Sequence, residues 1–369
     1  MKIVICGDFF IKKKIYGSMK NIIDDNIKQY LCESNYNILN LEAPITKKTK
    51  KINKHGPNLK MNPCIVNDLS TLNINAVNLA NNHLYDYGED GVYDTLKTLE
   101  DNKINFFGVN ISGKKYEYID LFIENKKILV LSFSENDFGN IKNNTGNIKF
   151  DPAKSLDVIK HYKQLCDFLI VLFHSGRELC FYPSPIQNEI SKQIIDNGAD
   201  MLIYQHSHCI SQAIEYHGKK IIFGQGDFFF DNRKVIDHGI LVEIIVDNDN
   251  LNVNIVPFVK KNNTLSALKN ISYNEYINNS KEMISLSTYS YKKKEFDFFC
   301  GERIWYYLSK ISKMPKIIRY IDRKYFNYSL IKLIIGKKYL AMLYEFFYSN
   351  THNEIILTGL KNEIEKRNK

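Results

Sequence analysis

The sequence predicts an α/β fold built on mixed β-sheet, and two observations support this prediction. Apolar runs typical of buried strands alternate with amphipathic helical segments over the first half of the chain. Short apolar runs separated by polar turns, typical of hairpins, dominate from residue 214 onward. Alternating strands and helices alone would indicate a parallel sheet. Because hairpins pair their strands antiparallel, their presence indicates a mixed sheet.

The individual elements follow from the spacing of apolar residues. Strands are expected over residues 2–10, 36–41, 74–79, 104–109, 168–173 and 200–204, and hairpins over 116–133, 214–222 and 240–259. Helices are expected around residues 23–31, 92–99, 151–162 and 184–194. The last helix should begin with Ser184 as its N-cap, because Pro185 and Gln187 follow at the positions that helix starts favour.

Composition places the chain among globular proteins with a substantial core. The 369 residues exceed the usual length of one domain, and 44% are hydrophobic while 25% are charged. Lys and Arg outnumber Asp and Glu by 50 to 41, and the net charge of +9 favours anionic partners. Since no motif of a known nucleic-acid-binding module appears, we expect no nucleic-acid partner.

Cysteine usage and hydropathy bear on location. Seven cysteines occur without a Cys-x-x-Cys pair, which favours free thiols in a reducing compartment. Only four apolar residues separate Met1-Lys2 from Gly7, too few for a signal peptide, and no apolar run approaches the roughly 18 residues of a spanning helix. We therefore expect a cytoplasmic protein, with peripheral attachment at the inner membrane as a further expectation.

The composition changes near residue 262, where Asn, Ser, Lys and Tyr become frequent. We therefore expect one domain over residues 1–262 and a basic, mostly helical region over residues 263–369. No internal repeat is visible in either part.

A basic amphipathic segment covers residues 310–338, with nine Lys or Arg and one acid, Asp322. On a helix its basic and apolar side chains fall on different faces: Lys316, Arg319 and Arg323 on one, Ile317, Ile321 and Tyr325 on the other. This pattern fits two alternatives equally. The segment lies on an anionic membrane surface, or it packs as a helical subdomain on the main domain.

Two amides and an imidazole occupy a loop between an expected strand and an expected helix, in the stretch Asn78-Leu79-Ala80-Asn81-Asn82-His83. Such loops carry the chemistry of many α/β proteins, because a rigid strand fixes side chains that the loop then exposes. Taken alone, the stretch is explained more simply by turn-forming asparagines and a solvated histidine.

Ligand-type side chains recur, however, at the ends of five expected strands: Asp8, Glu42, Asn82, His83, His174, His206 and His208. If they served no common site, each of the seven would need a separate reason to place a ligand-type side chain at a strand end. We therefore expect them to converge at one edge of the sheet.

His206 and His208 form the sharpest pair. Two histidines two residues apart in extended backbone project to the same side and can reach one metal ion. Together with carboxylates and an amide, the set suits two divalent ions of Mn, Fe or Zn better than Mg or Ca. Two such ions about 3.5 to 4 Å apart would hold a hydroxide and polarise a phosphoryl oxygen.

Several short motifs occur in an order that is known from one family: Gly7-Asp8, Asn40-Leu41-Glu42, Asn78-Leu79-Ala80-Asn81-Asn82-His83, Asp86-Tyr87-Gly88, His174-Ser175-Gly176-Arg177-Glu178, Gly198-Ala199-Asp200, His206-Ser207-His208 and Gly226-Asp227-Phe228. In these motifs the sequence resembles the capsule-synthesis CapA family. That family is the poly-γ-glutamate branch of the calcineurin-like metallophosphoesterases. The resemblance covers roughly residues 1–260.

The resemblance implies a sandwich of two mixed β-sheets between helices, with a dinuclear metal site at one edge. It also implies a ligand set for each metal: Asp8 and His208 for one, and Asn82, His174 and His206 for the other. By the same resemblance Glu42 would bridge the two ions. His83 would protonate the leaving group or contact the phosphoryl oxygen. Three further residues would orient the ligands: Asn40, Asn81 and Glu178.

The sequence also departs from the family pattern. Wider phosphoesterases have Asp-x-His at the first motif, whereas Asp8 is followed by Phe9-Phe10, which leaves one metal short of a ligand. Asp227 stands where Asn is usual, and Gln205 where Gly or His is common. The N-terminal membrane anchor of many capsule-type members is not expected either.

Two functions remain as expectations. The first is a metal-dependent hydrolase linked to capsule or poly-γ-glutamate synthesis, acting on a phosphoester or on an amide of a polyglutamate-like polymer. The second is a non-catalytic polymer-binding or assembly component that docks at the membrane surface. An anionic substrate or polymer is the expected partner in both.

Overall fold

The computed structural model describes residues 2–12, 17, 19–54, 56–123, 125–135, 144–231, 238–247, 250–261, 264–267, 293–312, 314–336, 339–340 and 342–344. The chain divides into two compact units, Met1–Phe296 and Asp297–Lys369, which are considered separately below. The change of composition expected at residues 262–263 lies outside the described residues, and the domain division based on it stays a prediction.

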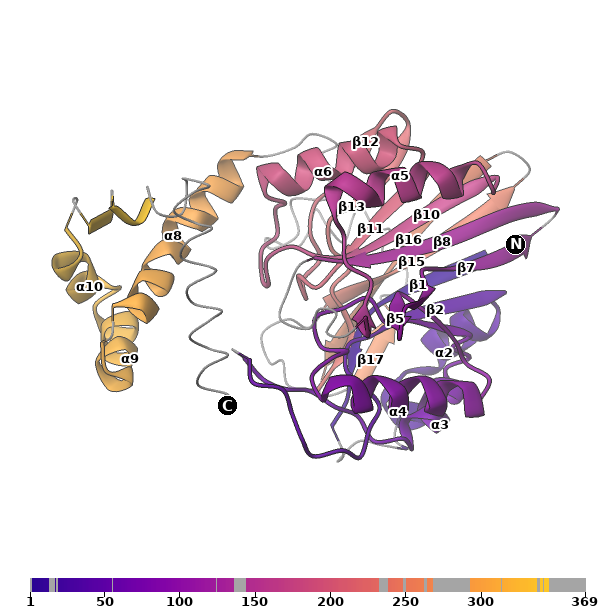
Figure 1. The fold of residues 1–369 in the computed structure, drawn as a ribbon, viewed down its shortest axis with the longest axis horizontal. Helices are drawn as coiled ribbons and strands as arrows, with labels where there is room; N and C mark the ends of the chain where they lie inside the picture. Colours follow the sequence, from indigo (N-terminus) through magenta and orange to yellow (C-terminus); the bar gives the residue numbers. More distant parts are fainter. Residues whose placement is uncertain are drawn as a thin grey trace. The chain divides into compact units, whose positions relative to one another are not determined.

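The first unit contains an eight-stranded sheet in which parallel and antiparallel strands mix (Figure 1). Its strands, from one edge to the other, are β17 (Thr264–Ala267), β16 (Asn250–Lys261), β15 (His238–Asp247), β1 (Lys2–Phe10), β2 (Tyr36–Leu41), β3 (Ala76–Asn78) and β4 (Asn105–Phe107), with β14 (Asp227–Phe230) also paired to β1. Strands β1 to β4 run parallel, while β15 runs antiparallel to β1.

A six-stranded sheet faces the first one. Its strands, in order, are β12 (Ala213–Tyr216), β13 (Lys219–Ile222), β11 (Met201–Gln205), β10 (Phe168–His174), β8 (Lys126–Ser134) and β7 (Tyr118–Ile123). The four central strands are parallel, and antiparallel hairpins close both edges. A small third sheet consists of β6 (Lys114–Tyr116), β5 (Val109–Ile111) and β9 (Gly146–Asn147).

Helices cover the outer face of each large sheet (Figure 1). The eight-stranded sheet carries α1 (Met19–Ile22), α2 (Asp25–Cys32), α3 (Ile65–Thr71) and α4 (Gly88–Asp101), and the six-stranded sheet carries α5 (Pro152–Lys163) and α6 (Pro185–Asp196). Alternate side chains of a central strand therefore enter different cores. In β1, Ile3 and Ile5 pack between the sheets, while Val4 and Cys6 pack under the helices. The expected sandwich of two mixed sheets between helices is confirmed.

Most expected elements occur with small shifts of their ends. The strands at 2–10 and 36–41 have the expected bounds, and the Ser184 Oγ accepts a hydrogen bond from the Gln187 N–H (3.0 Å) at the start of α6. The single strand expected over 104–109 is wrong. It divides into β4 and β5 at Gly108, whose φ of +81° no strand residue adopts, and a Cβ there would lie 2.6 Å from the Ala80 nitrogen.

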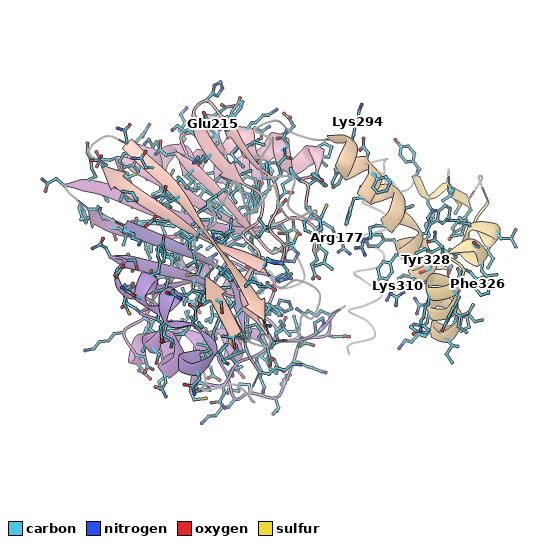
Figure 2. All side chains as sticks on the ribbon, turned by 180° about the vertical axis from the view of Figure 1, so that it is seen from behind. Arg177, Glu215, Lys294, Lys310, Phe326 and Tyr328 are labelled. Carbon is cyan, nitrogen blue, oxygen red and sulfur yellow. The ribbon has the colours of Figure 1, made fainter. Side chains whose placement is uncertain are left out.

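The second unit is helical where it is described. Helix α8 (Lys293–Ile311), most of which lies in this unit, is followed by α9 (Lys316–Tyr325) and α10 (Ser329–Ile334); Figure 2 marks Lys294 near the start of α8 and Lys310 near its end. Leu308, Ile331 and Ile335 form a small core between these helices. No helix in the described part of the chain is long and apolar enough to cross a bilayer.

Candidate metal centre

The expected ligand residues lie at the carboxyl ends of strands from both large sheets. Asp8 lies near the end of β1, and Glu42 directly follows β2. His174 is the last residue of β10, while His206 and His208 follow β11. All five side chains are at least 90% buried. The two sheets thus bring acids from one side and imidazoles from the other to the same edge.

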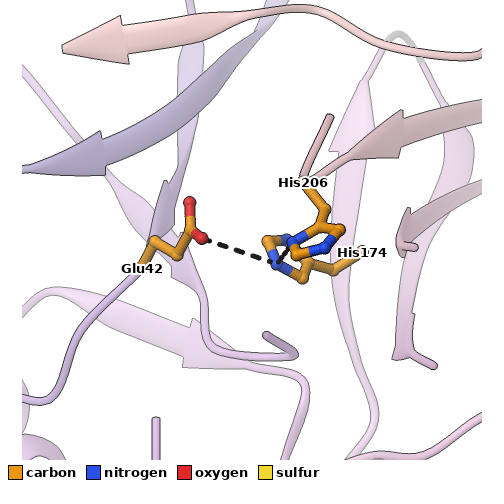
Figure 3. A group of neighbouring side chains, drawn as sticks. All are labelled: Glu42, His174 and His206. Carbon is orange, nitrogen blue, oxygen red and sulfur yellow. Dashed lines mark hydrogen bonds and ion pairs between the residues drawn. The ribbon is translucent and has the colours of Figure 1, made fainter. Parts of the chain in front are cut away.

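Glu42, His174 and His206 form a first group of possible metal ligands (Figure 3). The Glu42 Oε1 lies 3.8 Å from the His174 Nε2, which lies 3.1 Å from the His206 Nδ1. One ligand atom from each residue falls within 4.8 Å of the others, the spacing that one ion requires of its donors. Asn82 belongs to the same group, because its Oδ1 lies 3.1 Å from the His174 Nε2.

Asp8, Glu42 and His208 form a second group with the same 4.8 Å limit. The Asp8 Oδ2 lies 3.3 Å from the His208 Nδ1, and the Glu42 Oε1 lies 3.5 Å from the His208 Nε2. Glu42 therefore belongs to both groups, the position that a bridging carboxylate occupies. Imidazole, carboxylate and amide donors at this spacing are the kind that hold a divalent transition-metal ion or zinc.

Hydrogen bonds hold the ligand side chains in place. The Asn40 Nδ2 donates to the Asp8 Oδ1 (2.6 Å) and lies 3.2 Å from the His174 Nδ1. The backbone N–H of His206 donates to the Asp8 Oδ2 (2.9 Å), although 198 residues separate the two in the sequence. Asn81 donates to the Leu41 carbonyl (2.9 Å), just before Glu42. Asn40 and Asn81 thus contact the backbone or side chains of the ligand set.

Burial sets the protonation of this cluster. It lowers the pKa of His174 well below its ordinary value, and the neighbouring His206 and His208 lower it further. His174 is therefore neutral near pH 7, the form whose nitrogen binds metals. Burial raises the pKa of the Asp8 carboxyl, against the lowering effect of His208. A bound cation would favour the ionised carboxylate that a metal ligand must be.

His83 belongs to a separate buried group beside these ligands. Its Nδ1 lies 2.7 Å from the Asp86 Oδ2 and 3.2 Å from the Lys54 Nζ, and Lys54 and Asp86 form a buried ion pair. Burial lowers the pKa of His83, whereas Asp86 raises it and Lys54 lowers it. The solvated loop histidine of the simpler interpretation is therefore wrong.

The comparison with protein families decides where this chain belongs. The family model of the bacterial capsule synthesis protein PGA_cap matches residues 2–232, more than half of the 369 residues. The chain belongs to this family. The resemblance to CapA proteins found in the sequence motifs is confirmed.

Individual PGA_cap relatives match the same part of the chain. PGA biosynthesis protein CapA of Bacillus subtilis (strain 168) is 30% identical over 238 residues, which cover 61% of this chain and 62% of that protein. Capsule biosynthesis protein CapA of Bacillus anthracis is 26% identical over 245 residues, covering 63% and 60%. The match thus spans about three fifths of the length of each relative.

Solved structures resemble the fold at low sequence identity. A crystal structure described as a novel phosphatase from Mycoplasma pneumoniae is 16% identical, with a TM-score of 0.45, and covers 70% of this chain and 93% of that chain.

The structure also brings Asp227, from the Gly226-Asp227-Phe228 motif, to the site, although Asp227 was not among the expected ligands. Its Oδ1 lies 2.6 Å from the His208 Nδ1, and its Cα is the register partner of Asp8 where β14 pairs with β1. A hydrogen bond from Nδ1 to Asp227 leaves the His208 Nε2 facing Glu42, the arrangement that orients metal-binding histidines. The sequence showed Asp227 within a family motif, where it stands in place of the usual Asn, and its place in that motif was the available signal.

Two further residues of the loops near the site are Lys54 and Glu178. In the lysine-rich stretch 47–54, Lys48, Lys50 and Lys51 are exposed, as is usual for a polar loop. Lys54 differs from them, because its side chain is only 5% exposed and pairs with Asp86. Glu178 is half-buried in the loop after β10, and the contacts described above do not include it. Its orienting role stays a prediction.

A cavity of about 380 Å³ opens beside the ligand residues. Ser175 and Ser207, which line it, are chain neighbours of His174 and of the two histidines after β11. Its walls are largely aromatic and aliphatic, and Arg177 brings a positive charge at an exposed position (Figure 2). The one acid in the described lining, Glu135, accepts hydrogen bonds from the Ser175 hydroxyl (2.7 Å) and the Gly176 N–H (3.2 Å). The cavity can therefore receive an anionic group next to apolar parts of the same molecule.

Replacing Lys54 tests the buried group around His83. We expect Lys54→Met to lower the free energy of unfolding by about 3 kcal/mol, because it leaves the Asp86 carboxylate buried without its cation. The pKa of His83 should rise, since a positive charge that lowers it is removed. Urea unfolding and NMR titration measure both effects. The exposed Lys50→Met is the control, and equal stability of the two variants would contradict the assignment.

Proposed function

We propose that the protein is a metal-dependent hydrolase that acts in the synthesis of a capsule or poly-γ-glutamate polymer. The observation that carries this proposal is the shared Glu42 carboxylate, which faces imidazoles of both ligand groups. The names of the CapA relatives support the pathway, and we extend it from them to this chain. The metallophosphoesterase character implied by the sequence motifs supports the reaction type.

The residues that would hold the metals follow from the two groups. One ion would bind between Asp8, Glu42 and His208, and the other between Glu42, His174 and His206 with Asn82. Bound divalent ions of Mn, Fe or Zn would supply an activated water and polarise the group under attack. Because no histidine follows Asp8, three side chains would hold the first ion, the number of protein ligands typical of catalytic sites.

The chain's own residues would position the substrate and move a proton. Asp86 accepts from the His83 Nδ1, which leaves Nε2 as the ring atom that can meet a leaving group. An anionic substrate near His83 favours the protonated ring, because it offsets the burial that lowers the pKa. Arg177, at the cavity beside the ligands, would attract the same anionic group.

The substrate class is a phosphoester or an amide of a polyglutamate-like polymer. Both reactions pass through a tetrahedral or phosphoryl species whose developing negative charge buried cations and a proton donor stabilise. Both substrates also carry the negative charge that the net charge of +9 favours.

Glu42→Gln tests the shared carboxylate, because it keeps the side-chain volume and removes the charge. We expect metal affinity to fall by about tenfold or more, with loss of the second bound ion. Elemental analysis of protein equilibrated with Mn or Zn measures the bound equivalents. Glu243→Gln, at a buried glutamate that pairs with Lys2, is the matched control. Unchanged metal content in Glu42→Gln would overturn the bridging role.

His83→Ala tests the proton donor. We expect kcat to fall by about 10²- to 10⁴-fold, the range of general acid catalysis, while metal content stays unchanged. The assay uses Mn-loaded protein with generic phosphodiesters and with polyglutamate. Undiminished turnover in the variant would exclude the role of His83, and a wild type that turns over neither substrate would exclude the hydrolase.

A second candidate function, docking at a membrane surface, is favoured by the exposure of apolar side chains in the second unit. Ile317 is 73% exposed and Leu333 84% exposed, and Ile334 is 63% exposed. Helices with a basic face and an exposed apolar face lie in the interface of anionic bilayers. We propose that α9 and α10 hold the protein peripherally at such a surface, whether or not the metal centre is catalytic.

Vesicle co-sedimentation tests this docking. We expect Ile317→Ser with Leu333→Ser to reduce the fraction bound to phosphatidylserine vesicles by about tenfold, because both side chains would insert into the bilayer. Phe122→Ser with Ile186→Ser is the control, since these residues are 72% and 73% exposed in the first unit. Equal binding of both double variants would rule out the helices as the docking surface.

A further inference from the structure

A pocket of about 190 Å³ lies between α8 and α9, within the second unit. Four cationic side chains line it: Lys310, Lys316, Arg319 and Arg323. Figure 2 shows Lys310 together with Tyr328, another lining residue, on this part of the molecule. The pocket is smaller than the roughly 300–1,000 Å³ sites of drug-sized ligands, so it suits a single small group.

The cations converge because α8 and α9 each contribute to the walls of the pocket. Lys316, Arg319 and Arg323 follow one another at i, i+3 and i+7, which places them on one face of α9. Lys310 joins them from the last turn of α8. The small core formed by Leu308, Ile331 and Ile335 joins α8 to the segment after α9 and so keeps the pocket in shape.

No acidic side chain lines this pocket among the residues whose side chains are described. Asp322, the one acid of the segment, is buried and faces α10 instead. Its carboxylate oxygens accept the backbone N–H groups of Leu330 (2.9 Å) and Ile331 (3.1 Å) at the start of that helix. None of the four cations has an ion pair within the described part of the unit. Among the described side chains, four like charges thus line one small volume with no carboxylate in its walls.

Tyrosine hydroxyls add neutral hydrogen-bond donors to the same walls. Tyr306, Tyr320 and Tyr328 line the pocket. Burial raises the pKa of Tyr328, although the guanidinium groups of Arg323 and Arg303 lower it, so its hydroxyl stays protonated and can donate. The Lys310 Nζ lies 5.3 Å from the centre of the Tyr306 ring, which helps to hold it at the wall.

We propose that this pocket binds a phosphate group. A phosphate ester carries close to two negative charges and three acceptor oxygens, which match several cations and hydroxyl donors together. Two arginines add the planar, paired donors that bind phosphate oxygens bidentately. A single carboxylate would use only one of the four positive charges.

The pocket and the apolar row of α9 lie on different faces of the helix. Ile317, Ile321 and Tyr325 form that row, spaced by four residues, while the pocket cations occupy the other side. A phosphate site and membrane insertion can therefore be separated by substitution. The phosphate can belong to a lipid headgroup or to a soluble molecule, and the experiment distinguishes these sources.

The test measures binding of inorganic phosphate to the full chain by calorimetry, after chelation has removed metal from the first unit. We expect saturable binding that weakens by about tenfold or more in Arg319→Gln with Arg323→Gln, which loses two charge-assisted contacts. Lys294→Gln with Lys332→Gln removes the same charge from exposed positions on α8 and α10 that do not line the pocket, and should change affinity less than about twofold. Circular dichroism checks that both variants keep their helices.

Several results would overturn the proposal. Absence of saturable phosphate binding would show that the pocket is not a phosphate site. Phosphate binding that is lost when metal is removed would assign the binding to the metal centre of the first unit instead. Equal weakening in both double variants would indicate non-specific attraction. Tighter binding of triglutamate than of phosphate would assign the pocket to carboxylates. Two further outcomes identify the source of the phosphate. Binding to phosphatidic acid vesicles that requires Arg319 and Arg323 would indicate a lipid headgroup. Binding of inorganic phosphate without binding to these vesicles would indicate a soluble molecule.

Discussion

The buried carboxylate of Glu42 between imidazoles of the opposing sheet is the interaction on which the rest of the site depends. A carboxylate removed from water is costly unless cationic or hydrogen-bonding groups meet it. Glu42 follows a strand of the eight-stranded sheet. His174, at 3.8 Å, ends a strand of the six-stranded sheet, and His208, at 3.5 Å, follows another strand of that sheet. The site therefore exists only when the two sheets close on each other, so folding and ligand assembly are the same event.

Hydrogen bonds between the sheets, just behind the ligands, keep this closure in register. The Asn78 side chain, on β3, donates to the Gln205 Oε1 on β11 (3.1 Å) and accepts from the Ser132 hydroxyl on β8 (2.7 Å). Gln205 in turn donates to the Cys6 carbonyl of β1 (3.2 Å). Gln205, a departure from the family pattern, thus joins the two sheets one residue before His206. A buried polar network of this kind fixes one relative position of the layers, because any slip would leave its members without partners.

The chain divides its chemistry between its two units. The first unit concentrates carboxylates and imidazoles at a sheet edge, with Arg177 beside them, while the second concentrates lysines and arginines on short helices. Both arrangements favour anionic molecules, the first through the metals it can hold and the second through direct ion pairs. Proteins that handle a charged polymer profit from such a division, since one surface can retain the chain while another acts on it.

The sequence by itself determined the fold class, the family, most strand positions and the residue types of the site, because apolar periodicity and strand-end chemistry are local properties. It also showed the two faces of the basic segment. Only the tertiary structure decided the contacts: the 3.8 and 3.5 Å from Glu42 to His174 and His208, the bond of Asp227 to His208, and the ion pair of Lys54 with Asp86. Asp8 meets the backbone of His206 across 198 residues. The packing of two sheets sets such distances, and no local pattern in the chain encodes them.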